Sequence, residues 1–139
     1  MKQTLRDNIV GLPYSLHDMH VTELVINGND LIFKFMDGFE QNIVNGVLVK
    51  GEICFHEADL DSCFVYVLDF CGNEGSFTGH KYAFADFTAE NKKIDFEIID
   101  ETYGYNSSKL AGWLWGGEEP KECILDLYHF GAMEYITEE

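Results

Sequence analysis

Residues 21–35, VTELVINGNDLIFKF, decide the fold class. In the second half of this stretch, Leu31 and Phe33 alternate with Ile32 and Lys34, which is the two-residue period of a β-strand. The first half alternates in the same way, and the connecting Asn27-Gly28-Asn29-Asp30 is rich in turn-forming residues. The stretch therefore predicts an antiparallel hairpin with a four-residue connection.

The same period recurs along most of the chain. Further strands are expected at residues 39–44, 47–55, 63–70, 77–87, 94–98, 103–105, 109–115, 121–130 and 133–136. Short strands joined by polar turns are typical of antiparallel sandwiches and barrels, whereas parallel βαβ folds need long crossovers. We expect residues 1–139 to form one all-β domain, an antiparallel sandwich or partly open barrel of eight to ten short strands with at most one or two helical turns.

A few segments depart from the strand pattern. Residues 56–62 predict an acidic loop or a single helical turn, and residues 4–12 show weak helical spacing that Pro13 would end. Turns are expected at Asn45-Gly46, at residues 72–76 and at residues 89–93.

Composition restricts the classes of partner. The chain has 9 Lys and Arg against 25 Asp and Glu, a formal net charge of −16 that is spread over both halves of the sequence. Binding to phosphate groups needs Lys and Arg, so neither nucleic acid nor an anionic membrane surface is an expected partner. The acids either keep a folded surface solvated or form one side of an interface with a basic protein.

The cysteines and the start of the chain bear on the compartment. No apolar segment of signal-peptide or membrane-span length is visible, so a cytoplasmic protein with reduced thiols is expected. Cys54, Cys63 and Cys123 lie in apolar strand-like runs and are expected to be buried and inert. Cys71 precedes a Gly-rich turn and is expected to be the most exposed of the four.

Two aromatic pairs are the main candidates for a binding surface. Residues two apart on a strand share a face, so Tyr103 should pair with Tyr105 and Trp113 with Trp115. If exposed, these rings could grip a protein or stack on sugars, and if turned inward they are core. The acids expected to set the electrostatic field around them are Asp95, Glu97, Glu118 and Glu119.

A histidine-rich segment is a weaker candidate for a metal site. His17, Asp18 and His20 could bind a divalent cation or take part in acid–base chemistry. On an extended chain His17 and His20 point to opposite sides, so a structural turn is the favoured interpretation.

The remaining titratable candidates are isolated in the sequence. A third metal ligand could come from His56, His80 or His129, although none of them has a recognised ligand spacing. Asp69 and Asp126 lie inside apolar strands, and we expect both on the solvated face of their strands because an unpaired buried charge is costly.

The sequence holds no nucleotide-binding, zinc-protease, nucleophile-elbow or EF-hand motif, and no cofactor is expected. In size, acidity and lack of catalytic motifs the chain is similar in type to many immunity proteins, which bind and block toxins, often basic nucleases. This resemblance covers no motif, and it implies a non-enzymatic binding protein with a basic protein partner.

Two alternatives remain open. The first is a carbohydrate-binding β-sandwich that uses the same Tyr and Trp residues. The second and weaker one is a metal-dependent enzyme centred on His17, Asp18 and His20. An edge strand could also pair with its copy in a homo-oligomer.

Overall fold

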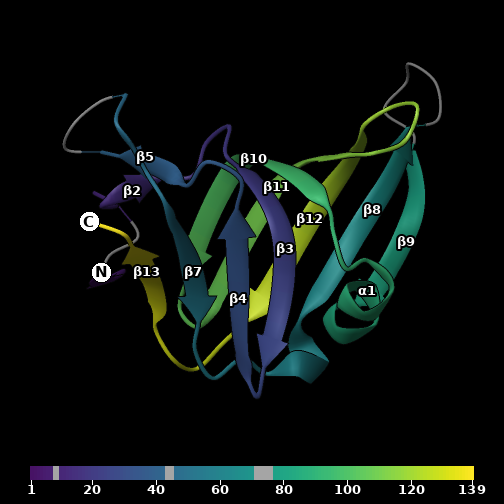
Figure 1. The fold of residues 1–139 in the computed structure, drawn as a ribbon. Helices are drawn as coiled ribbons and strands as arrows, with labels where there is room; N and C mark the ends of the chain where they lie inside the picture. Colours follow the sequence, from purple (N-terminus) through teal and green to yellow (C-terminus); the bar gives the residue numbers. More distant parts are fainter. Residues whose placement is uncertain (8–9, 43–45, 71–76) are drawn as a thin grey trace.

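The computed structural model describes residues 1–7, 10–42, 46–70 and 77–139. Within these ranges the chain forms a ten-stranded and a three-stranded antiparallel sheet, together with one α-helix and one 3₁₀ turn (Figure 1). The expected all-β, sandwich-like fold is confirmed, and the large sheet does not close into a barrel. In the described chain no helix has the length and hydropathy of a membrane span.

The ten-stranded sheet has the order β1-β13-β7-β4-β3-β10-β11-β12-β8-β9. In that order the strands are β1 (Lys2–Leu5), β13 (Met133–Thr137), β7 (Gly51–Phe55), β4 (Asp30–Phe35), β3 (His20–Asn27), β10 (Asp95–Gly104), β11 (Ser107–Trp115), β12 (Lys121–Tyr128), β8 (Phe64–Phe70) and β9 (Phe77–Ala83). The small sheet consists of β2 (Tyr14–Ser15), β5 (Phe39–Gln41) and β6 (Leu48–Val49).

The large sheet folds over so that its two halves enclose the core. In Figure 1, β7, β4 and β3 lie in front of β10, β11 and β12. Phe33 of β4 and Phe55 of β7 are fully buried, as are Phe96 of β10 and Leu110 of β11. Every second side chain of these strands therefore points into one shared interior, and its neighbours point outward.

The helix α1 (Phe84–Glu90) corrects one sequence prediction. We expected a single strand over residues 77–87 and a turn at residues 89–93, but β9 ends at Ala83. Phe84 and Phe87 are three residues apart and both are buried, which is the spacing of one helix face. Phe84 stacks on Phe33 with ring centroids 6.2 Å apart, so core packing accounts for the helical turn at this point.

The expected helical segment at residues 4–12 is also wrong. Lys2–Leu5 is a strand, β1, which pairs antiparallel with β13, and residues 8–9 lie outside the described chain. The helical turn expected within residues 56–62 is confirmed as the 3₁₀ turn η1 (Leu60–Ser62).

The hairpin of β3 and β4 is confirmed with a tighter connection than expected. Asn27 pairs with Asp30, so only Gly28 and Asn29 link the strands, and Gly28 adopts a φ of 64°. Of the other predicted turns, Asn45 and residues 72–76 lie outside the described residues, as does Cys71.

A β-bulge shapes the hairpin of β10 and β11. Ile98 pairs with Gly112 and Asp100 with Ala111, so Ile99 is an extra residue on β10. A Cβ atom built on Gly112 would lie 1.8 Å from the carbonyl oxygen of Glu97. Only glycine lets the two backbones approach this closely.

We predict that Gly112→Ala destabilises the protein by about 1–3 kcal/mol, because the new methyl group must push the two strands apart. The matched control is Gly117→Ala in the loop after β11, where the nearest atom to a built Cβ is the Glu119 oxygen at 3.7 Å. Urea denaturation of both variants measures the difference. Equal stability of the two would contradict the account of the bulge.

Candidate functional site

The outer side of β10 and β11 brings acids and tryptophans into register. Asp95 pairs with Trp115 and Glu97 pairs with Trp113 across the two strands. On β3, the next strand of the sheet, His20 pairs with Glu97. These five residues, His20, Asp95, Glu97, Trp113 and Trp115, form what we call the acidic–aromatic patch.

Hydrogen bonds connect the members of the patch. The Trp115 indole Nε1–H donates to Glu97 Oε1 over 3.2 Å. His20 Nδ1 and Asp95 Oδ1 are 2.5 Å apart, with each side chain about one-third exposed. Trp115 is 43% exposed, whereas Trp113 is partly buried. The patch therefore presents one open indole ring beside two carboxylates that solvent can reach.

The patch continues toward the next strand through a shallow depression. Ile99, Asp100, Ala111, Gly112, Trp113 and Glu122 line a hollow of about 190 Å³. Glu122 of β12 lies opposite Trp113, so the hollow has a carboxylate on two sides. It lies where the bulge at Ile99 displaces β10 from a regular pairing with β11.

The two tyrosines do not share a face as expected. Tyr103 is 7% exposed and its hydroxyl donates to Glu101 Oε1 over 2.6 Å, whereas Tyr105 is 94% exposed. The reason is that β10 ends at Gly104, and Tyr105 lies in the turn before Asn106, whose φ is 58°. Burial raises the pKa of Tyr103 above its ordinary range. Tyr103 is thus a core residue.

The acids of the loop after β11 are exposed. Glu118 and Glu119 follow Trp115 in the sequence and precede β12, so they belong to the loop that leaves the patch. Asp69 pairs with Lys121 over 3.1 Å, and Asp126 lies opposite Lys109, so neither carboxylate is an isolated buried charge. The expectation that both lie on the solvated face of their strands is confirmed for Asp126, which alternates with the buried Leu125 and Leu127. It is wrong for Asp69, which shares the face of the buried Val65 and Val67 and is reached by solvent because it lies near the end of β8.

The histidine-rich segment forms a turn, as expected, and its two imidazoles diverge. His17 Nδ1–H donates to the carbonyl of Ile99 over 2.7 Å, and this bond raises the pKa of His17. Asp18 adopts a φ of 67°, and His20 engages Asp95 instead. Among the described residues, the donor atoms of His17, Asp18 and His20 do not lie close enough together to hold one metal ion.

The three described cysteines are free and buried, which confirms their predicted position. Burial and the nearby Asp30 and Glu134 carboxylates raise the pKa of Cys54 to about 11, and burial raises the pKa of Cys123 to about 12. These thiols are protonated near neutral pH and are poor nucleophiles.

A buried polar chain ties the N-terminal segment to the sheet. Arg6 Nη1 donates to Ser108 Oγ over 3.1 Å, and Ser108 lies 2.8 Å from His129 Nε2. His129 Nδ1 is 2.8 Å from the Gly131 carbonyl, which can only accept, so Nδ1 carries the proton and Nε2 accepts from Ser108. Ser108 and His129 are at most 1% exposed, so this Ser–His pair is structural.

Comparisons with family models, with curated proteins and with solved structures gave no match. The function has to be inferred from the side chains themselves.

We predict that His129 makes folding stability fall as the pH falls below about 6.5. Burial lowers the pKa of His129 from its ordinary value of 6.5, so the unfolded chain binds a proton that the folded chain resists. The wild-type protein should therefore have a higher free energy of unfolding than His129→Gln, and the difference should be larger at pH 7.5 than at about pH 5.

Urea denaturation across this pH range measures the difference, with His80→Gln on exposed β9 as the control for losing one imidazole. A difference between wild type and His129→Gln that grows on acidification would contradict the assignment of a neutral, buried imidazole.

Proposed function

We propose that the protein is a non-enzymatic binding protein that engages a basic segment of a protein partner through the acidic–aromatic patch. The observation that carries this proposal is the register of β10 and β11, which sets Asp95 opposite Trp115 and Glu97 opposite Trp113. Carboxylates next to indole faces form the environment that an arginine side chain recognises, because a guanidinium both stacks on the ring and pairs with the acid.

The depression beside Trp113 supports arginine as the group bound. Its volume of about 190 Å³ corresponds to the room of roughly six water molecules, which is enough for one guanidinium group. Asp100 and Glu122 line it together with Trp113. A single arginine could then be held in the hollow while a neighbouring one stacks on Trp115.

Charge complementarity supports a basic protein over other partners. The acids around the patch extend into the loop at Glu118 and Glu119, and the whole chain carries −16. Such a field speeds the encounter with a positively charged protein and disfavours acidic competitors. An inhibitor of immunity type that blocks a basic toxin in the cytoplasm fits this charge, and the free buried thiols fit a reducing compartment.

Carbohydrate binding is the competing function, and the placement of Trp113 and Trp115 on one side of β11 is the observation in its favour. Only Trp115 of the pair is exposed, and its indole N–H is occupied by Glu97. Sugar stacking would depend little on salt, so ionic strength separates the two functions.

We predict that Trp115→Ala weakens binding to a basic partner by about 30-fold, the loss expected when an aromatic anchor is removed. Asp95→Asn combined with Glu97→Gln should weaken it by about fivefold or more and should flatten its salt dependence between about 0.05 and 0.5 M NaCl. Fluorescence anisotropy against a labelled Arg-Gly peptide and a panel of basic nucleases measures both effects.

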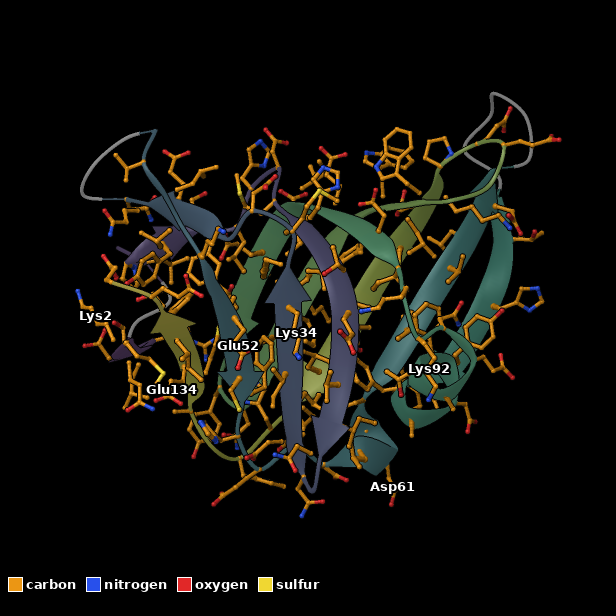
Figure 2. The ribbon with its side chains drawn as sticks, in the orientation of Figure 1. Lys2, Lys34, Glu52, Asp61, Lys92 and Glu134 are labelled. Atoms are coloured by element: carbon orange, nitrogen blue, oxygen red, sulfur yellow. The ribbon has the colours of Figure 1, made fainter. Side chains whose placement is uncertain are left out.

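The matched control for charge is Asp61→Asn combined with Glu90→Gln. Asp61 lies on η1 at the far end of the sheet in Figure 2, and Glu90 ends α1. This variant has the same net charge as the patch variant and should bind almost as wild type does. Equal weakening by both double variants, no binding at low salt, or salt-independent binding to a glycan panel would each overturn the proposal.

A further inference from the structure

A second group of chemically active side chains lies on the other half of the large sheet. Cys54 and His56 are two residues apart at the end of β7, so an extended backbone puts both on one face. Glu134 of β13 pairs with Cys54, and Asp30 begins the adjacent strand β4. Figure 2 shows Glu134 on β13, at the side of the molecule that β13, β7 and β4 form.

Cys54 is buried on the outer side of the sheet. It is only 4% exposed, yet it is absent from the hydrophobic core cluster that contains its neighbours Ile53 and Phe55. Charged side chains lie beside it. A thiol that lies next to a histidine and carboxylates can take part in binding a metal ion.

Two of the three distances between the donor atoms are close to those of a tetrahedral metal site. His56 Nδ1 lies 3.7 Å from Cys54 Sγ and 3.5 Å from Asp30 Oδ2, and the three donor atoms all lie within 4.8 Å of one another. In a tetrahedral zinc site the sulfur–nitrogen and nitrogen–oxygen edges are about 3.5 and 3.3 Å long. The Sγ–Nδ1 and Nδ1–Oδ2 edges each lie within about 0.2 Å of these values, and the Sγ–Oδ2 edge is no longer than 4.8 Å.

Two further hydrogen bonds orient the donor atoms. His56 Nε2 lies 2.9 Å from Glu134 Oε1, a carboxylate oxygen that can only accept, so Nε2 carries a proton and Nδ1 faces Cys54 Sγ and Asp30 Oδ2. Asp30 Oδ1 accepts from the backbone N–H of Glu57 over 3.1 Å, which turns Oδ2 toward His56. At 3.5 Å, Oδ2 is too far from Nδ1 for a strong direct hydrogen bond.

We propose that Asp30, Cys54 and His56 bind one Zn²⁺ ion, with Glu134 as the residue that positions His56. On binding, the Cys54 thiol releases its proton to solvent and coordinates as the thiolate. Zn²⁺ with one thiolate, one carboxylate and a neutral imidazole gives a locally neutral centre. The sulfur, nitrogen and oxygen donors suit a borderline cation such as Zn²⁺ better than Mg²⁺ or Ca²⁺, and the fourth position is left for water.

This site is separate from the acidic–aromatic patch, because Asp30 lies opposite Asn27 at the turn end of the β3–β4 hairpin, whereas His20 lies at the other end of β3. It does not depend on the proposed function, and loss of partner binding in the patch variants would leave it unaffected.

The test is metal titration of the full, reduced chain. Equilibrium dialysis with Zn²⁺ should give one ion per chain, and Co²⁺ as a spectroscopic substitute should give a thiolate-to-cobalt charge-transfer band with tetrahedral d–d bands. Cys54→Ser should abolish the charge-transfer band, and Asp30→Asn should lower the affinity for both ions. Glu134→Ala should weaken binding by about 10–100-fold, as removal of the partner of a metal-bound histidine does.

Two matched controls separate this site from general metal binding by an acidic chain. Cys63→Ser removes another buried thiol, and Glu119→Gln removes an exposed acid in the loop between β11 and β12, on the other half of the sheet. Both should keep the full band and affinity. Asp30→Asn, at a side chain 37% exposed, keeps the test valid if Cys54→Ser does not fold. Failure to bind Zn²⁺, a band that survives Cys54→Ser, or equal loss in Glu119→Gln and Asp30→Asn would overturn the proposal.

Discussion

Burial of one continuous set of apolar side chains between the two halves of a single sheet is the constraint on which the rest of the structure depends. Phe33 and Phe55 on one half and Phe96 and Ile98 on the other are fully buried. Because strand side chains alternate, committing these residues to the interior sends their neighbours outward. The acids and tryptophans of β10 and β11 are outward-facing for this reason, and the bulge at Ile99 resets the alternation so that Tyr103 can turn inward.

The parts of this fold that could be predicted from sequence are those set by local alternation. The hairpin of β3 and β4 was evident in its side-chain period, and the strand expected at residues 94–98 is part of β10, where Asp95 and Glu97 alternate with the buried Phe96. The helix α1 was missed because it is only seven residues long. Only two of its residues, Phe84 and Phe87, are buried, which is too few to establish a helical period in the sequence. The order of the strands could not be predicted from the sequence. For this reason nothing in the sequence beyond the spacing of Cys54 and His56 indicated that these two residues lie close to Asp30 and Glu134.

The strand order shows where the negative charge is concentrated on the molecule. Acids that are far apart in the chain flank the same strand, as Glu97 of β10 and Glu122 of β12 do on either side of Trp113 of β11. Such grouping costs stability through repulsion, and a bound cationic group relieves that cost. The same reasoning applies on the other half of the sheet, where Asp30 and Glu134 flank His56. We propose a basic protein segment as the ligand of the first group of acids and a zinc ion as the ligand of the second.

The most direct measurement of the central claim, that the acidic–aromatic patch is a binding surface, is nuclear magnetic resonance of the two indole N–H groups. The chain has only two tryptophans, so ¹⁵N labelling gives two indole signals that report on the patch alone. Titration with an Arg-rich peptide should move the Trp115 signal to saturation, because the ligand competes for the Glu97 carboxylate that its N–H contacts. Saturable binding of the peptide with both indole signals unchanged would contradict the account.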